Sequence, residues 1–497
     1  MPCSAIQSDT RRVLEEVLAL RDHVAEHGRS TFHQWQPRIE RPCFRLGAFN
    51  LAHYLTFRHE DLRPLQRRLM QLGLSSLGRA EGRVLASLDA LILALCGLAD
   101  VKPPRIIHRP NERQFFRGER LLARNANEIF GPAPDKRSGR ILVTLGSDAA
   151  ETPEVVAALV ANGADAVRIN CAHDNANAWG SMIAHVRAVE AKSGRRIPVL
   201  MDIGGPKVRT ASVRTPPGQD RLHVGDQLLL VTGEPIGSDA PPFSVGCTLP
   251  QIFTRIKVGD SVSLDDGKLH GRIVRRVAGG FVAQMQEGRD KGIRLKAEKG
   301  INFPGVDLGL DPLTAQDHKD LDFIAEHADM VGYSFVETAD HVARLQDELA
   351  ARRADWRKLA LVAKIETPRA VRNLPAIIVQ AAGRQPLAVM IARGDLAIEI
   401  GFERLAEMQE EILWLCEAAH VPAIWATQVL EGLVSKGLPS RGEMTDAAMS
   451  GRAECVMLNK GPNAPAAVAA LDRLLQRMNE HQHKKTPTLR ALHAWAD

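Results

Sequence analysis

The stretch LAVMIARGDLAIEI, residues 387–400, decides the fold because an apolar run in it ends abruptly in charge. Residues 387–392 are all apolar, which is typical of a strand covered on both faces in a parallel sheet. Arg393 and Asp395 follow within three positions. A charged pair directly after a core strand predicts that this strand ends at a polar edge of its sheet.

Seven other short apolar runs alternate with amphipathic helical patterns through the chain after about residue 138. The eight runs are ILVTL (141–145), ADAVRIN (164–170), IPVLMD (197–202), ADMVGYSF (328–335), LALVAKIE (359–366), LAVMIARGD (387–395), VPAIWAT (421–427) and ECVMLNK (454–460). Such alternation predicts a parallel sheet, and eight strand–helix units close a TIM barrel. The predicted fold class is therefore α/β, with a TIM (β/α)8 barrel.

Two parts of the chain do not fit the barrel pattern. The interval between the third and fourth runs is too long for a loop and holds turn-separated strand patterns such as VGDSVSLDDGKL. It predicts a small all-β domain inserted after the third strand. The predicted parts are an N-terminal helical region and linker (1–137), the first part of the barrel (138–210), the inserted β domain (211–298), the second part of the barrel (299–484) and a tail (485–497).

Composition places the chain among soluble globular proteins. It has 497 residues, of which 45% are hydrophobic and 25% charged, with a net charge of +5. Seven dispersed cysteines without a Cys-x-x-Cys pair suit reduced thiols in a cytosol. The N-terminus lacks the apolar core of a signal peptide, and VLASLDALILALCGL (84–98) is too short for a membrane span. We expect a cytoplasmic protein, with that segment as a buried helix and no membrane partner.

Polar residues stand at the carboxyl ends of seven of the eight runs, where TIM barrels hold their active sites. They are Arg168 and Asn170, Asp202, Ser334, Lys364 and Glu366, Arg393 and Asp395, Thr427, and Asn459 with Lys460. Some polarity is expected wherever a barrel mouth meets water. Polar side chains at seven of eight ends, however, indicate a functional site.

The chemistry of these side chains suits a phosphorylated substrate. Glu366 and Asp395 offer carboxylate oxygens on adjacent strands, a pair that can hold Mg²⁺ together with substrate oxygens. Lys364 and Arg168 supply fixed positive charge for phosphate and for a developing enolate, and Thr427 could anchor phosphate or relay a proton. Lys364 and Glu366 could simply form an ion pair. Their spacing of two, however, puts both on the inward face of the strand, where charge without a task is costly.

At these residues the sequence resembles the pyruvate kinase family. The matching segments are VRINCAH, MDIGGPKVRT, LDDG, KGINFPG, ADMVGYSF, AKIET, ARGDLAIEI, ATQVLEGL and PSRGEMTDAA. They follow the family's order over roughly two thirds of the chain, from about residue 139 to 470. The inserted β domain matches the position of the family's lid domain, and we call it the lid below.

The resemblance implies phosphoryl transfer from phosphoenolpyruvate to ADP, giving pyruvate and ATP in glycolysis. By this resemblance Glu366 and Asp395 would ligate Mg²⁺, or Mn²⁺ in its place. Arg168 and Lys364 would hold the phosphoryl group, and Lys364 would also stabilise the enolate. These would be the reacting end of the site.

The same resemblance implies roles for a second set of residues. Thr427 would contact phosphate beside the path of proton delivery, and the Gly394–Asp395 backbone would cradle the substrate carboxylate. His173, Arg209 and Lys299 would face the nucleotide across a cleft that the lid closes. Closure would exclude water, which otherwise hydrolyses the transferred group.

The monovalent-cation region departs from the family's pattern. Members that require K⁺ build its site from Asn, Ser, Asp and Thr. Here Asn170 and Asp202 remain, while Ala172 and Ile203 occupy the other two places. Lys207 stands where K⁺-dependent members carry Glu, and a fixed ammonium can supply the same single positive charge. We therefore predict that K⁺ is not required.

The nucleotide side and the chain ends also depart from the family. Gly204 replaces a lysine, Ser147 replaces a proline, and MLNKGPN replaces the usual Ser-Gly-Glu, which leaves nucleotide preference open. We expect the family's C-terminal effector domain to be absent. The extra residues 1–137 are expected either to form a homo-oligomer contact or to cover barrel surface. The Gly-rich connection between two predicted helices in this region could suggest a DNA-reading helix pair. Such connections are also common in plain helix bundles, so we do not expect nucleic-acid binding.

Two other functions stay open at this point. A lyase or aldolase-type barrel acting on phosphoenolpyruvate or pyruvate would keep Glu366, Asp395 and Arg168. It would not need the three predicted nucleotide-binding residues. A catalytically idle metabolite-binding regulator would not need Lys364 and Thr427 together.

Overall fold

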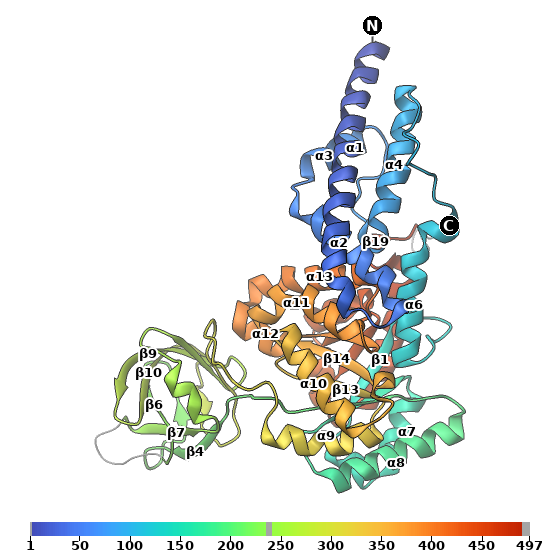
Figure 1. Cartoon of the computed structure of the whole chain (residues 1–497). Helices are drawn as coiled ribbons and strands as arrows, with labels where there is room; N and C mark the ends of the chain where they lie inside the picture. Colours follow the sequence, from blue (N-terminus) through green and yellow to red (C-terminus); the bar gives the residue numbers. More distant parts are fainter. Residues whose placement is uncertain (1, 235–240, 490–497) are drawn as a thin grey trace, which may run out of the picture.

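The computed structural model describes residues 2–234 and 241–489, and a closed barrel of eight parallel strands lies at its centre (Figure 1). The strands are β1 (Arg140–Thr144), β2 (Ala166–Asn170), β3 (Val199–Asp202), β13 (Met330–Tyr333), β14 (Ala360–Ile365), β15 (Leu387–Ala392), β16 (Ala423–Ala426) and β17 (Cys455–Leu458). β17 pairs with β1 and closes the barrel. Each of the eight predicted runs overlaps one of these strands, which confirms the predicted TIM barrel.

The apolar runs are continuous because each strand is covered on both faces. In β1, Leu142 belongs to the cluster inside the barrel, whereas Ile141 and Val143 belong to the larger cluster between strands and helices. Successive side chains of a strand point to opposite faces, so both clusters need apolar residues. Ile129 and Phe130, which precede the first barrel strand in the sequence, also belong to the inner cluster.

Helices surround the barrel, as the alternating pattern predicts. They are α7 (Pro153–Ala161), α8 (Ala176–Ser193), α9 (Ala315–His327), α10 (Ala339–Arg352), α11 (Pro368–Ala382), α12 (Arg393–Ile400), α13 (Phe402–Ala419), α14 (Glu431–Lys436), α15 (Arg441–Met449) and α16 (Ala464–His481). Single 3-10 turns lie at Ser147–Ala150, Trp356–Lys358 and Ser450–Arg452. A short hairpin, β18 (Gln482–His483) and β19 (Thr486–Pro487), follows α16, and the predicted tail beyond residue 489 lies outside the described residues.

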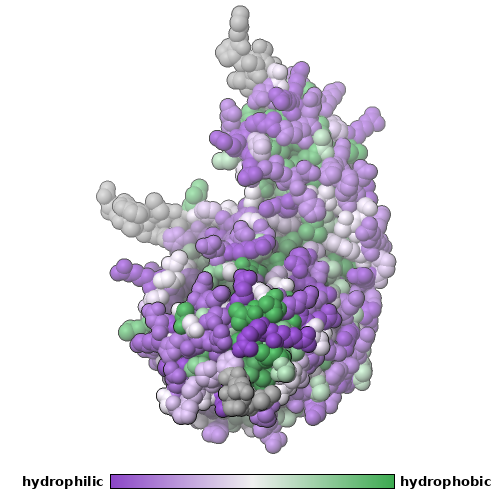
Figure 2. Space-filling view, turned by 90° about the vertical axis from the view of Figure 1, so that its left-hand side faces the viewer, coloured by the Kyte–Doolittle hydropathy of each residue, from purple (hydrophilic) through white to green (hydrophobic). Residues whose placement is uncertain are grey.

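The lid is a separate β structure that stands away from the barrel in Figure 1. Its strands are β4 (Thr210–Arg214), β5 (Arg221–Leu222), β6 (Gln227–Val231), β7 (Phe243–Cys247), β8 (Ser261–Leu264), β9 (Leu269–Val277), β10 (Gly280–Gly288), β11 (Ile293–Arg294) and β12 (Ile301–Asn302), with a 3-10 turn at Pro250–Thr254. Seven of them form one sheet in the order β12-β8-β9-β10-β6-β7-β4. This sheet reaches just beyond the predicted insert at both ends. Figure 2, seen from the lid side, shows apolar patches among a mostly hydrophilic surface.

The N-terminal region is helical and rises from one side of the barrel (Figure 1). Its helices are α1 (Pro2–Trp35), α2 (Arg45–His59), α3 (Arg63–Gln71), α4 (Val84–Ala99), α5 (Glu112–Phe115) and α6 (Arg117–Phe130), with 3-10 turns at Gln36–Arg38, Pro42–Phe44 and Glu81–Arg83. α1 and α4 run side by side away from the barrel. By length and composition the stretch Glu81–Ala99, with a mean hydropathy of 1.8, could cross a membrane, yet 44% of it is already buried in the protein.

The N-terminal helices cover barrel surface at the end of α13. A Cβ on Gly47 of α2 would lie 2.2 Å from the carbonyl oxygen of Ala419, so only glycine allows this approach. Asn50 donates to the carbonyl of Ala418 at 2.8 Å and accepts from the Val84 amide at 3.0 Å. These contacts fix α2 and the start of α4 on the helix that leads into β16.

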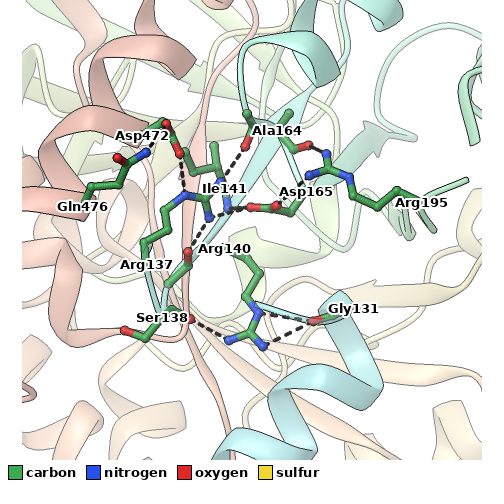
Figure 3. A network of polar contacts seen from close by, with 12 residues as sticks. Gly131, Arg137, Ser138, Arg140, Ile141, Ala164, Asp165, Arg195, Asp472 and Gln476 are labelled. Carbon is green, nitrogen blue, oxygen red and sulfur yellow. Dashed lines mark hydrogen bonds and ion pairs between the residues drawn. The ribbon is translucent and has the colours of Figure 1, made fainter. Parts of the chain in front are cut away.

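A buried polar network joins the amino ends of the barrel strands (Figure 3). The Arg137 side chain, only 1% exposed, donates to Asp472 Oδ1, Asp165 Oδ2 and the Gly163 carbonyl, each at 2.7 Å. Asp165 Oδ2 also accepts from the Ile141 amide at 2.8 Å. The network therefore ties β1, β2 and α16 together on the side of the barrel opposite to the carboxyl ends.

Replacing Arg137 with methionine is expected to lower the free energy of unfolding by about 3–5 kcal/mol, because it removes the 2.7 Å partner of the buried Asp165 carboxylate. Urea unfolding followed by circular dichroism measures the loss. Arg195→Met is the matched control: Arg195 contacts the other oxygen of Asp165 at 3.4 Å, and its side chain is 40% exposed. Losing it should cost under about 1 kcal/mol. Equal losses in the two variants would contradict the prediction.

Candidate active site

The carboxyl ends of the barrel strands surround a cavity of about 210 Å³, which we call the catalytic cavity. Eight of the predicted site residues line it: Arg168, Asn170, Lys207, Arg209, Lys364, Glu366, Asp395 and Thr427. They come from loops and strands far apart in sequence, and the closed barrel brings them together. Asp202, Gly394, His173 and Lys299 do not line this cavity.

Asp202 lies directly behind two of the cations. Arg168 Nε donates to Asp202 Oδ2 at 2.6 Å, and Lys364 Nζ is 3.6 Å from the same oxygen. Burial of this carboxylate opposes its ionisation, but the charges of Arg168 and Lys364 outweigh burial and hold its pKa below the usual range. A Cβ on Gly332 would lie 1.7 Å from Asp202 Oδ1, so the neighbouring strand must carry glycine here. Asp202 thus fixes two cations toward the cavity.

Lys364 is held from three sides at the end of β14. Besides Asp202, its ammonium donates to Ser334 Oγ at 2.7 Å and lies 3.2 Å from Glu366 Oε1. Ser334 Oγ in turn donates to the Ile203 carbonyl at 2.8 Å. The sequence placed Ser334 at a strand end but gave it no role. The structure shows that it orients Lys364.

Glu366 and Asp395 are the carboxylates of the catalytic cavity. Glu366 is buried, and its Oε2 accepts from the Phe335 amide at 2.6 Å. Burial raises the pKa of Glu366, and the charge of Asp395 raises it further, although Lys364 acts in the opposite direction. A divalent cation would relieve this repulsion between hard oxygen ligands, so the donor set fits Mg²⁺.

The donor set also limits how such an ion could be held. Among the described residues, no group of three or more His, Cys, Asp or Glu side chains is placed to hold a metal. Two carboxylates are what Mg²⁺ commonly takes from a protein when substrate oxygens and water complete its shell.

Asp395 sits in the first turn of a helix rather than in the strand. β15 ends at Ala392, and the chain continues directly into α12. Lys207 Nζ lies 2.7 Å from Asp395 Oδ1 and 3.5 Å from Asp266 Oδ1 of the lid. Burial lowers the pKa of Lys207, but the charge of Asp395 outweighs it and raises the pKa above the usual range. Lys207 therefore stays charged between the barrel and the lid.

Of the predicted monovalent-cation residues, Asn170 and Lys207 both line the catalytic cavity, and Asp202 lies behind its cations. Asn170 and Asp202 are register partners on β2 and β3, whereas Lys207 contacts Asp395 at the start of α12. Asn170 Oδ1 accepts from the Ala172 amide at 3.2 Å. The ammonium of Lys207 therefore lies near the carboxylates rather than between Asn170 and Asp202.

Thr427 adopts a backbone conformation that is rare for a β-branched residue, with φ of 65°. Its Oγ1 accepts from the Gly394 amide at 2.7 Å, and its carbonyl accepts from Arg393 Nη2 at 2.7 Å. Arg393 also donates to Asp446 Oδ2 at 2.9 Å and stacks over Trp425, 4.7 Å from the ring centroid. Sequence analysis gave Arg393 and Asp446 no role. They hold Thr427 in its strained geometry.

Of the three predicted nucleotide residues, Arg209 alone lines the catalytic cavity. Lys299 lies 3.0 Å from Asp265 of the lid. His173 follows β2 on the exposed surface, and partial burial together with the charge of Lys460 lowers its pKa. The structure therefore leaves His173 and Lys299 at the edge of the site.

The geometry agrees with what comparison with known proteins finds. The family model described as pyruvate kinase, barrel domain, matches residues 136–466, which include all eight barrel strands and the lid. The chain belongs to the pyruvate kinase family. This confirms the predicted family. Residues 1–135, which hold α1 to α6, lie outside the match.

Several pyruvate kinases are similar to this family member over most of its length. One from Agrobacterium vitis is 32% identical over 369 residues, covering 72% of this chain and 71% of the relative. One from Geobacillus stearothermophilus is 32% identical over 316 residues, covering 63% of this chain and 51% of the relative. Pyruvate kinase 1 from Trypanosoma brucei brucei is 30% identical over 334 residues, covering 67% and 64%. These relatives support the predicted enzyme class, pyruvate kinase.

Proposed function

We propose that this member of the pyruvate kinase family transfers the phosphoryl group of phosphoenolpyruvate to ADP with Mg²⁺ and without K⁺, giving pyruvate and ATP. One observation carries the proposal. Partly buried cations that include Arg168 and Lys364, two carboxylates and a strained threonine line a single cavity at the carboxyl ends of the barrel strands. Phosphoryl transfer through a loose transition state needs this kind of positioning and charge neutralisation.

The phosphoenolpyruvate side would be served by groups that the fold already holds rigidly. Arg168 and Lys364, oriented by Asp202, would bind the phosphoryl oxygens, and Lys364 Nζ would also stabilise the enolate oxygen. Thr427 Oγ1 would contact the phosphoryl group and lie beside the incoming proton. The amino end of α12, at Gly394–Asp395, would cradle the carboxylate of the substrate.

Glu366 and Asp395 would hold Mg²⁺, or Mn²⁺, whose charge would offset that of the phosphoryl and enolate oxygens. The proposed independence from K⁺ rests on the ammonium of Lys207. It lines the catalytic cavity and lies 2.7 Å from Asp395, so it supplies one permanent positive charge there.

The nucleotide would enter from the lid side. Arg209 already lines the catalytic cavity, while His173 and Lys299 would join the nucleotide when the lid moves toward the barrel. Lys299 would have to exchange its contact with Asp265 for a phosphate oxygen. We propose ADP as the acceptor and place the reaction in glycolysis in the cytoplasm, with no membrane or nucleic-acid partner.

Pyruvate formation from phosphoenolpyruvate and ADP with Mg²⁺, measured with K⁺ and with Na⁺ alone, tests the proposal. Equal turnover in both salts supports it entirely. Turnover that requires K⁺ would support the proposed reaction but contradict the proposal that Lys207 replaces the monovalent cation. No transfer from phosphoenolpyruvate to any nucleoside diphosphate, together with C–C cleavage of a larger 2-oxo acid that releases pyruvate, would favour a lyase-type reaction. Phosphoenolpyruvate binding without any turnover would favour the idle regulator.

We also propose that α4 carries a contact between two copies of the chain. Its inner face packs on α1, and its only charged side chain, Asp89, pairs with Arg21 of α1 at 3.0 Å. Its exposed residues Ala94, Gly97 and Leu98 and the partly buried Ala86, Ala90 and Leu93 are all apolar or small. The helix is thus buried on one side only, and a helix that is apolar all round is typical of burial on every side. Across a two-fold axis, antiparallel helices would set Leu98 against Ala86.

Leu98→Glu is expected to convert a dimer into a monomer in size-exclusion chromatography with light scattering. Leu98 is 50% exposed, so the new charge would disturb the contact and leave the fold intact. Val258→Glu, at a 58% exposed lid position, is the matched control and should leave the dimer unchanged. A monomeric wild-type chain would rule out the contact.

A further inference from the structure

A second cavity lies where the lid joins the barrel. Its volume is about 550 Å³, more than twice that of the catalytic cavity, and within the range of small-molecule sites. It is bounded by residues 206–208 and 301–310, which connect the lid to the barrel, and by residues 367–373 at the start of α11. We call it the hinge cavity. We propose that the hinge cavity binds a small organic anion with an apolar body and one uncharged polar group.

The charges around the hinge cavity leave one cation without a partner. Arg369 pairs with Asp307 at 3.1 Å and with Glu337 at 3.4 Å, so one arginine serves both carboxylates. Lys207 pairs with Asp395 of the catalytic cavity. Arg372 is exposed at the rim and has no hydrogen bond or ion pair within the described part of the chain. Its guanidinium therefore offers a contact at the rim for an anionic group on the ligand.

Two partly buried polar side chains line the interior. Glu399, on α12, accepts from Asn302 Nδ2 at 3.3 Å, and its burial raises its pKa and favours the protonated form. His341 Nδ1 accepts from the Glu337 amide at 3.3 Å, which leaves the proton on Nε2 free to donate. Burial and the neighbouring arginines lower the pKa of His341 and keep it neutral. A hydroxyl, amide or amine group of a ligand suits these partners.

Apolar side chains form a further part of the wall of the hinge cavity, beside the polar Thr367 and Asn373. Val306, Leu308 and Leu310 of the lid connection are partly exposed to it, and three proline residues border it. Apolar surface of this kind favours a ligand with an aromatic or aliphatic body. The order of groups in the ligand would therefore be an anion at Arg372, an apolar body, and an uncharged polar group near Glu399.

Occupancy of the hinge cavity would reach the catalytic cavity through shared walls. Lys207 and Phe335 line both cavities. The Phe335 amide holds Glu366, and Lys207 holds Asp395. A bound anion would thus contact the two residues that fix both carboxylates, as well as both connections of the lid. We expect it to slow turnover without competing with phosphoenolpyruvate, a consequence that rests on the proposed function, whereas binding itself does not.

The probe for binding is 1-anilinonaphthalene-8-sulfonate, which combines a sulfonate, apolar rings and one N–H. Fluorescence titration of the full chain should show one saturable site. Arg372→Ala should raise its Kd about fivefold through loss of a charged contact at the rim. Leu308→Trp, which fills the cavity from a partly exposed position, should abolish that site. Arg404→Ala, an exposed arginine on α13 outside the cavity, is the matched control and should leave Kd unchanged.

Two results would overturn the inference. One is a Kd that neither Arg372→Ala nor Leu308→Trp changes. The other is displacement of the probe by phosphoenolpyruvate with Mg²⁺, which would place it in the catalytic cavity. Binding of the probe as expected, without pyruvate formation, would support the ligand site in the hinge cavity and contradict the proposed function. Normal turnover without a saturable probe site would support the proposed function and contradict the ligand site in the hinge cavity.

Discussion

Lys364→Met is expected to lower kcat for pyruvate formation by about 10³-fold, because it removes the fixed charge that faces the developing enolate. In the structure Lys364 Nζ is held by Ser334 at 2.7 Å and by the carboxylates of Glu366 and Asp202 at 3.2 and 3.6 Å. These three contacts keep the ammonium in one position. A water molecule in its place would carry no charge and would not be held in the same way. A coupled spectrophotometric assay for pyruvate at saturating substrate measures the loss.

Lys358→Met is the matched control for this prediction. It makes the same substitution six positions earlier, where the side chain is 79% exposed and its one ion pair among the described residues is with Asp355 at 3.5 Å. Its turnover should equal that of the unsubstituted chain. Thermal unfolding of both variants separates lost chemistry from lost fold. A Lys364→Met variant that is folded and retains most of its kcat would show that the catalytic cavity works differently from the proposal.

Lys207→Glu is expected to lower kcat/KM by about 10²–10³-fold in Na⁺ buffer. The change replaces a positive charge 2.7 Å from Asp395 with a negative one, at a site where an interaction of unit charges is worth several kcal/mol. Adding K⁺ should raise the kcat/KM of the variant about tenfold, since the new carboxylate offers a ligand for a monovalent cation. Initial rates across a K⁺ titration at constant ionic strength measure both effects.

The control is Lys291→Glu, an exposed lysine of the lid that makes the same charge change away from the catalytic cavity. It should alter kcat/KM less than about twofold, because exposed charges are screened by solvent and salt. If the unsubstituted chain is itself inactive without K⁺, the ammonium of Lys207 does not replace a monovalent cation. A Lys207→Glu variant that K⁺ does not rescue would assign Lys207 to the lid contact with Asp266 instead.

Local pattern was enough for the barrel because its strands are buried on both faces. Each strand must be apolar throughout, so every one of the eight appears in the sequence as a short unbroken run. The lid was harder. β9 and β10 alternate clearly, but β4 and β7, with sequences TASVR and FSVGC, carry too few apolar residues to stand out. α2 escaped prediction because its buried positions lie on most of its surface and leave no amphipathic stripe.

The side chains with chemistry were found for a related reason. A polar residue at or just beyond the end of a core strand is conspicuous, and Lys364, Glu366, Asp395 and Thr427 all stand in such places. Ser334 stood there too, but its role depends on a contact with Lys364 across two strands. Arg393 stood beside Asp395, yet only the fold shows that it turns toward Asp446, 53 positions away, and supports Thr427.

The sequence by itself determined the barrel, the inserted lid, the helical N-terminal region and most residues of the catalytic cavity. These follow from periodicity and from charge at strand ends, which are local properties of the chain. The tertiary structure alone decided which side chains pair: Asp202 behind two cations, Lys207 against Asp395, and Arg372 left over at the hinge cavity. Such pairings depend on distances between segments that 34 to 188 residues separate, and no local pattern encodes a distance of that kind.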